Sequence, residues 1–175
     1  MKIKFAIVLA ILVYLLSARF CFGVDVSIGY GNGIKIWHDE GVKYTVAQLT
    51  VSDEIRHPWY GSVVVIGMQC ELDTPRVIDD SPFSYWSNGM VITSRVEGRW
   101  KLYKNIVGRL FGGFGILIGE LPEIGDSGII GHFGVRISYS IGQWEVGYEA
   151  WHLSDPLTHG DSGWEAQLLV VSRSF

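Results

Sequence analysis

Hydrophobic and polar residues alternate along most of the chain, in segments of about ten residues separated by turn-forming residues. Alternation with a period of two is the pattern of β-strands. Eight strands are predicted, at residues 24–31, 42–52, 61–72, 88–97, 110–120, 130–141, 144–154 and 164–175. Connections are predicted at 31–33, 39–41, 53–60, 73–87, 122–128 and 142–143, the last as a tight hairpin. The sequence therefore predicts an all-β domain.

Two consecutive segments indicate how the strands are used. In residues 133–140 one face is apolar and aromatic, and the other holds glycine, serine and Arg136. Glu145 and Glu149 lie on the polar face of the next strand, so opposite charges can pair across a hairpin inside a small barrel. These strand lengths favour an eight-stranded antiparallel up-and-down transmembrane β-barrel. A soluble barrel or sandwich, with the apolar face inside, stays an alternative.

The N-terminus has the pattern of a secretory signal peptide: a positively charged start, an apolar run and a small residue, Gly23, at the cleavage point. The apolar run is shorter than the roughly 20 residues that span a bilayer as a helix. We therefore expect a signal peptide at 1–23 and a barrel domain at 24–175. A lipid-modified Cys21 is the alternative. After cleavage Cys70 is the only cysteine, which excludes an intramolecular disulfide.

The composition limits the partners. Charged residues make up 18% of the chain and the net charge is −4, with lysine and arginine scattered rather than clustered, so we expect no nucleic-acid partner. The histidines lack the spacing of metal ligands, which predicts no metal site and a surface position for an isolated histidine such as His132. The glycine-rich stretch 108–115 lacks the ending of a phosphate-binding loop and indicates close strand packing.

The chemically distinctive residues lie near the C-terminal end. On an extended chain, the apolar face that begins at Trp144 continues into His152 and Ser154. Residues two apart on a strand have Cα atoms about 7 Å apart, so an imidazole and a hydroxyl there can act as base and nucleophile. The turn-rich loop at 157–163 returns the chain antiparallel and brings Glu165 near the end of the same strand. A carboxylate at that place can orient the imidazole.

This arrangement resembles a known family. His152-Leu-Ser154, a loop, Gly163-Trp-Glu165 and an aromatic C-terminus are similar to the terminal signature of the PagL-type outer-membrane lipid A 3-O-deacylases. The resemblance implies an eight-stranded barrel with His152 as base, Ser154 as nucleophile and Glu165 as orienting acid. It also implies lipid A of lipopolysaccharide as the substrate, no cofactor, and a place among outer-membrane lipids. Asp155 stands where the family usually has asparagine, whose amide is thought to help bind the oxyanion.

Several alternatives stay open. His159, in the loop, competes with His152 as the base, although a strand holds a base more rigidly than a loop does. The stretch 99–104, which alternates basic with apolar residues, suits a lipid headgroup interface or a solvated turn. The whole chain can be a non-enzymatic small outer-membrane barrel or a soluble secreted β-barrel esterase. The sequence does not determine the oligomeric state, and a homodimer is one of the alternatives.

Overall fold

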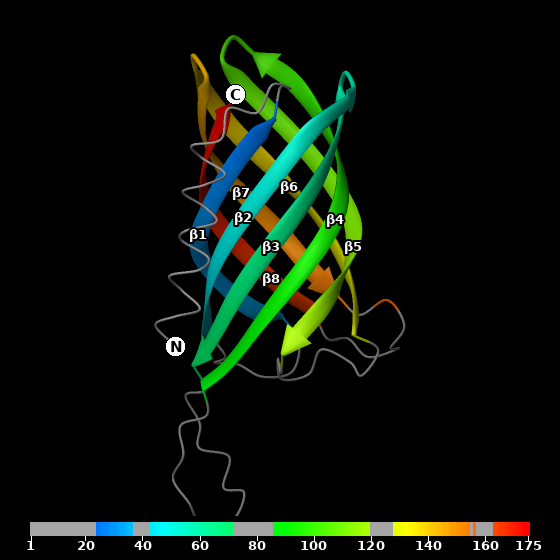
Figure 1. Cartoon of the computed structure of the whole chain (residues 1–175). Coiled ribbons are helices and arrows are strands. Elements are labelled where there is room, and N and C mark those ends of the chain that lie inside the picture. Colours follow the sequence, from blue (N-terminus) through cyan, green and yellow to red (C-terminus); the bar gives the residue numbers. More distant parts are fainter. Residues whose placement is uncertain (1–23, 37–42, 72–85, 120–127, 155, 157–162) are drawn as a thin grey trace, which may run out of the picture.

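The computed structural model describes residues 24–36, 43–71, 86–119, 128–154, 156 and 163–175. The strands are β1 (Asp25–Ile36), β2 (Lys43–Arg56), β3 (Trp59–Glu71), β4 (Trp86–Tyr103), β5 (Ile106–Gly119), β6 (Ile129–Ile141), β7 (Trp144–Ser154) and β8 (Gly163–Ser174). Each strand pairs antiparallel with the next, and β8 closes on β1 (Figure 1). The prediction of an all-β, eight-stranded antiparallel up-and-down barrel is confirmed. The predicted signal peptide lies outside the described residues.

Within the described ranges, no helix is long and apolar enough to cross a membrane.

The two ends of the barrel differ. One, which we call the short-hairpin end, carries the two-residue hairpins at 57–58, 104–105 and 142–143, and the chain enters β1 and leaves β8 there (Figure 1). The tight hairpin at 142–143 was predicted correctly. At the other end, the long-loop end, the chain connects the strands through 37–42, 72–85, 120–128 and 155–162. Following paired residues once around the wall from Asp25 leads back to β1 at Lys35, so the strands are strongly tilted.

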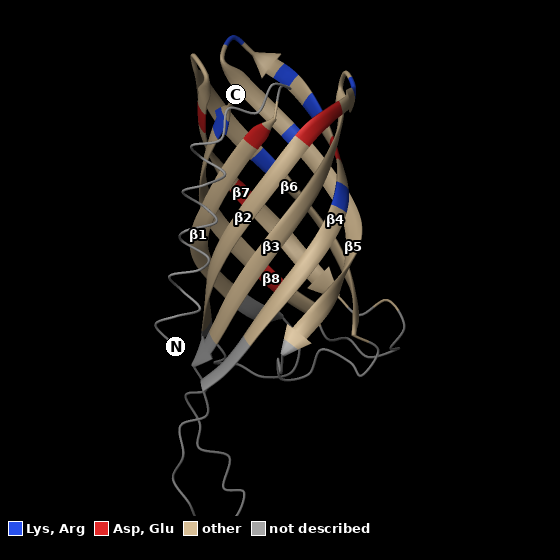
Figure 2. Ribbon diagram, in the orientation of Figure 1, with Lys and Arg blue, Asp and Glu red and all other residues tan. Residues whose placement is uncertain are grey.

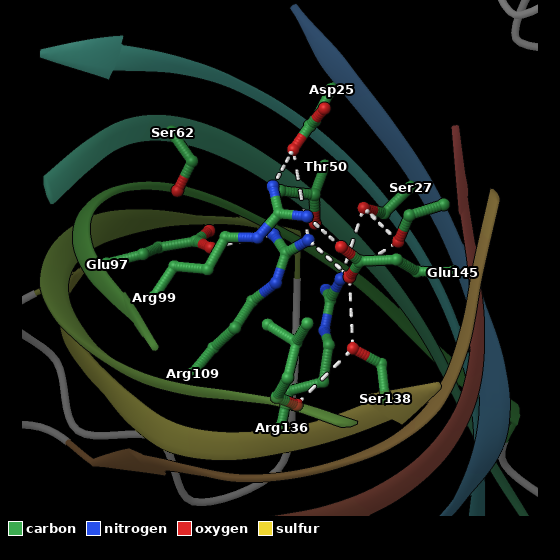
Figure 3. A network of polar contacts seen from close by, with 12 residues as sticks. Asp25, Ser27, Thr50, Ser62, Glu97, Arg99, Arg109, Arg136, Ser138 and Glu145 are labelled. Atoms are coloured by element: carbon green, nitrogen blue, oxygen red, sulfur yellow. Dashed lines mark hydrogen bonds and ion pairs between the residues drawn. The ribbon is translucent and has the colours of Figure 1, made fainter. Parts of the chain in front are cut away.

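Charged side chains fill the interior toward the short-hairpin end. Most of the blue and red segments of the ribbon in Figure 2 lie in this half of the barrel. In the described part of the chain the interior charged side chains are four arginines and four carboxylates: Arg95, Arg99, Arg109, Arg136, Asp25, Glu97, Glu145 and Glu149. Arg109 donates to Glu145 at 2.7 Å, within the network of Figure 3. Arg136 donates to Glu149 on the adjacent strand at 2.6 Å. The predicted pairing of these interior charges is confirmed, and it offsets the cost of burying them.

Among the described residues, the interior from the middle of the barrel to the long-loop end is mostly apolar. Its core consists of Tyr44, Val46, Val64, Ile66, Met68, Val91, Phe111, Ile130, Trp151, Leu153, Trp164, Ala166, Leu168 and Val170. The Trp151 indole donates to Gln48 Oε1 at 2.9 Å, and Gln48 donates to Glu149 at 2.8 Å. These two hydrogen bonds join the apolar half of the interior to the charged half.

The outer wall is largely apolar. Exposed large hydrophobic residues include Tyr30, Val63, Val96, Leu110, Phe114, Ile116, Phe133, Val135, Ile137, Tyr148, Leu169 and Val171. Trp144 at 47% and Tyr148 at 50% exposure face outward on β7, whereas Glu145 and Glu149 between them are buried. The wall thus presents mainly apolar side chains outward between its ends and keeps a cluster of paired charges inside, the reverse of a barrel that faces water.

The predicted connection at 53–60 exists but is shorter than predicted, because β2 and β3 extend into it and leave only His57 and Pro58 outside the strands. The reason is the Glu54 carboxylate, which accepts the His57 backbone N–H at 3.0 Å and the Tyr60 hydroxyl at 3.1 Å. These two hydrogen bonds tie both strands to the hairpin, so polar residues near it do not mark a loop.

Residues 98–109, which the sequence leaves between predicted strands, belong to β4 and β5 except for the hairpin at 104–105. Arg99 turns inward and donates to Asp25 at 2.8 Å, whereas Trp100 and Leu102 are exposed on the outside. This alternation is that of a strand. The solvated-turn interpretation of 99–104 is therefore wrong.

The predicted turn at 31–33 is also wrong, because β1 continues through it to Ile36. A Cβ at Gly33 would overlap the Tyr44 ring, and a Cβ at Gly31 would meet the backbone of Gln167. The missing side chains of these glycines let the Tyr44 ring of β2 and the backbone of β8 approach β1 closely. Glycine in a strand can therefore mark close packing and not a turn.

Candidate active site

The predicted base and acid meet on the outer wall near the long-loop end. The register places Phe133 of β6, His152 of β7 and Glu165 of β8 directly opposite one another. His152 Nδ1 lies 3.6 Å from Glu165 Oε1, which is longer than a hydrogen bond but within ion-pair range for a protonated imidazole. The Phe133 ring lies 4.9 Å from the imidazole on the other side, tilted by 37°. His152 is therefore held between an aromatic ring and a carboxylate.

Ser154 lies in the adjacent row, on the same face of β7 as His152. Its partners across the sheet are two glycines, Gly131 of β6 and Gly163 of β8. A Cβ at Gly163 would overlap the His152 imidazole, nearest to Cε1 and 2.7 Å from Nε2, so the ring lies over the residue of β8 that pairs with the serine. Nδ1 faces the Glu165 carboxylate, whereas the Ser154 hydroxyl lies on the β6 side, 3.4 Å from where a Cβ at Gly131 would be. Among the described residues no hydrogen bond joins His152 and Ser154, so the structure brings the predicted base and acid together and leaves the serine in the neighbouring row.

Packing inside the wall keeps these residues outside. Trp151, Leu153 and Trp164 alternate with the site residues along β7 and β8 and are almost fully buried in the apolar core. The Tyr44 hydroxyl donates to the backbone carbonyl of Glu165, and its ring packs edge-on to Trp164 at 4.7 Å. Because neighbours on a strand point to opposite faces, burial of the core residues fixes the outward direction of the site.

Sequence reasoning missed Phe133, which has no motif and becomes visible only from the β6–β7 register. It was also wrong about His132, which is not a surface residue but points into the barrel with 1% of its area exposed. His132 Nδ1 lies 2.9 Å from Thr93 Oγ1, and the imidazole packs edge-on to Phe111 and Trp151. It is on the inner side of the wall and does not reach the outer site.

Three elements of the predicted site lie outside the described residues: Asp155, the competing base His159 and the rest of the loop at 157–162. Their predicted roles stay predictions. In the part of the chain that the structure describes, no group of three His, Cys, Asp or Glu side chains is arranged to hold a metal ion.

Fold and site together define a closed eight-stranded barrel with an imidazole, a carboxylate and a serine hydroxyl gathered on its outer wall. Comparison with protein-family models and with curated proteins finds no match.

Proposed function

We propose that the protein is an outer-membrane serine esterase that removes an ester-linked acyl chain, the 3-O chain, from lipid A of lipopolysaccharide. His152 is the general base, Ser154 the nucleophile and Glu165 the acid that orients the imidazole. The observation that carries the proposal is the position of His152, which has Nδ1 3.6 Å from Glu165 and its ring over Gly163, the partner of Ser154.

The distribution of side chains supports a membrane location. Apolar residues on a closed wall, with eight charged side chains paired inside, suit hydrocarbon around the barrel and leave no unpaired strand edge. Barrels of this kind have short turns in the periplasm and longer loops outside the cell. On that rule the short-hairpin end is periplasmic, and the site lies in the leaflet that contains lipopolysaccharide.

The site also suits an acyl substrate. Tyr148 lies on the same face of β7 as His152, and Phe133 lies beside the imidazole. These two side chains are 50% and 54% exposed, so the surroundings of the proposed triad are apolar. A lipid ester that diffuses within the leaflet reaches this face directly, whereas a water-soluble ester has to leave water. The resemblance of the 152–165 motif to the lipid A 3-O-deacylases supports lipid A as that ester.

In the proposed mechanism, His152 Nε2 takes the proton of the Ser154 hydroxyl as Oγ forms a bond to the acyl carbonyl carbon. The tetrahedral intermediate collapses, the C–O bond to the sugar breaks, and the sugar oxygen takes the proton from the imidazolium. Water, deprotonated by His152, then hydrolyses the acyl-serine and releases the fatty acid. Glu165 stabilises the imidazolium in both steps, because its carboxylate faces Nδ1. Backbone N–H groups at Asp155 or the following loop are the predicted donors to the oxyanion.

Mass spectrometry of lipid A incubated with the purified barrel in detergent tests this function. Wild-type protein should remove one acyl chain from lipid A, which lowers its mass by that of the chain. Ser154→Ala and His152→Ala should each abolish this loss of mass. Ser94→Ala, at an exposed serine of β4, is the matched control and should keep wild-type turnover. Heat-modified gel mobility shows that each variant is folded. Unchanged lipid A with folded wild-type protein would instead favour the non-enzymatic barrel.

A further inference from the structure

The outer wall carries a second polar feature beside the proposed triad. One register row crosses the wall through Gln167 of β8, Asn32 of β1, Thr45 of β2 and Gln69 of β3, each directly opposite the next. Asn32, Gln69 and Gln167 are exposed and Thr45 is partly exposed. Among the described residues, none of these four side chains has a hydrogen-bond partner. We call them the polar row.

The same register row is apolar on the other side of the barrel. Beyond Gln167 it continues through Ala150, Val135 and Leu110, on β7, β6 and β5. Val135 and Leu110 are exposed, at 50% and 57%. The character of one continuous row thus changes from apolar to amide and hydroxyl at β8, the strand that carries Glu165.

Proximity to the water-facing rim does not explain this change. Ile118 is the next-to-last residue of β5 and Ile129 is the first residue of β6, so both lie next to the long-loop end. Both are nevertheless apolar and exposed, at 44% and 41%. Gln167 and Asn32 lie further from the ends of their strands. The polarity therefore belongs to one side of the barrel and not to one height.

We infer that the polar row binds the sugar headgroup of the glycolipid substrate. This inference rests on the proposed function. Amide and hydroxyl side chains supply both donors and acceptors without charge, which matches the hydroxyl and amide groups of an acylated amino sugar. Uncharged polar groups that face hydrocarbon are unfavourable unless a partner satisfies them, and a sugar in the outer leaflet is such a partner.

The geometry also gives the substrate a direction. Gln167 follows Glu165 by two residues on the same outer face of β8, about 7 Å away. Ser154 lies between this polar side and the exposed apolar residues Phe114 and Ile129 of β5 and β6. An ester bond at Ser154 then has its sugar over β8 and β1 and its acyl chain over β6 and β5.

The test compares a substrate with a sugar and one without. For the full-length barrel in detergent, kcat/KM is measured on lipid A and on p-nitrophenyl octanoate. The double variant Asn32→Leu and Gln167→Leu should lower the ratio of the two values at least about tenfold, mainly through KM for lipid A, because two hydrogen bonds are lost. The matched control is Asn105→Leu with Gln143→Leu, two exposed amides in hairpins at the opposite end. It should leave the ratio unchanged.

Binding is measured separately, so that the two proposals fail independently. In a Ser154→Ala background, native mass spectrometry should show lipid A bound, and the added Asn32 and Gln167 changes should weaken binding about tenfold. A wild-type protein that cleaves neither substrate rejects the esterase, and the binding measurement still tests the polar row. Equal binding and an equal ratio overturn the inference. A change in oligomeric state alone, with both unchanged, also overturns it and makes the row a contact between copies of the chain.

Discussion

A single methyl group at Gly163 should disable the proposed triad without unfolding the barrel. The Cβ of alanine at this position would overlap Cε1 of the His152 imidazole and would lie 2.7 Å from Nε2 and 3.2 Å from Nδ1. Ordinary contacts between such atoms begin at about 3.5 Å, so the imidazole has to move by at least about 1 Å. The Phe133 ring, 4.9 Å away on the other side, blocks a retreat across the wall. The imidazole is therefore expected to swing outward, away from both Glu165 and Ser154.

The expected effect is large in turnover and small in stability. A misplacement of about 1 Å in a catalytic group costs roughly 100-fold in rate, so kcat of Gly163→Ala should fall by about that factor with KM little changed. The His152 side chain is 25% exposed and has lipid or detergent to move into. The free energy of unfolding should therefore fall by less than the 1–3 kcal/mol or so that is typical of an overpacked core.

Two other glycines calibrate this result. A Cβ at Gly67, on the outer face of β3, would be 3.8 Å from its nearest neighbour, so Gly67→Ala should keep wild-type kcat. A Cβ at Gly131 would be 3.4 Å from Ser154 Oγ, a tight but tolerable contact, so Gly131→Ala should fall between the other two. Turnover on p-nitrophenyl octanoate, with circular dichroism and gel mobility as tests of folding, gives the order. Wild-type turnover in folded Gly163→Ala would refute the placement of the imidazole.

Three further variants test the site and the interior. Glu165→Gln should lower kcat by roughly 10²- to 10⁴-fold at unchanged stability, since an amide cannot neutralise an imidazolium; a loss of less than tenfold in lipid A turnover would speak against an orienting acid. Glu149→Gln should destabilise the barrel by about 3–5 kcal/mol, because two buried arginines lose their carboxylate, and an unchanged urea midpoint in detergent would contradict this. Gly33→Ala should cost about 1–3 kcal/mol in the same measurement because its Cβ overlaps Tyr44, whereas Gly112→Ala, with its nearest atom 4.0 Å away, should not.

The strands could be predicted from the sequence where alternation and turn residues agree, as at the 142–143 hairpin and in the flanking strands. The prediction failed where one residue type serves two purposes. Gly31 and Gly33 were interpreted as a turn, but they make room for β8 and for Tyr44. Only the pairing of distant strands shows which use a glycine has, and a single sequence does not contain that pairing.

The candidate site could be predicted in part. The spacing of His152 and Ser154 and the return of the chain to Glu165 were sufficient to group these residues, because they lie on one hairpin. Phe133 was not found, since its contact with His152 depends on how β6 pairs with β7. The prediction for His132 was wrong because the alternation of β6 was not applied to it. Ile129 and Phe133 face outward, so His132, at an alternate position, faces inward.

A change of alternation phase marks this site in the sequence itself. Up to Tyr148 the apolar residues of β7 face outward, and from Trp151 onward they face inward, so that His152 and Ser154 take the outer positions. A barrel wall in hydrocarbon gains nothing from such a reversal, because it exchanges apolar for polar groups on the lipid side. The reversal is stable here because Trp151 and its apolar neighbours fill the interior at the same height. On the proposed membrane location, polar residues that a strand turns outward over an apolar core need a reason other than folding, and on β7 we attribute them to the proposed chemistry.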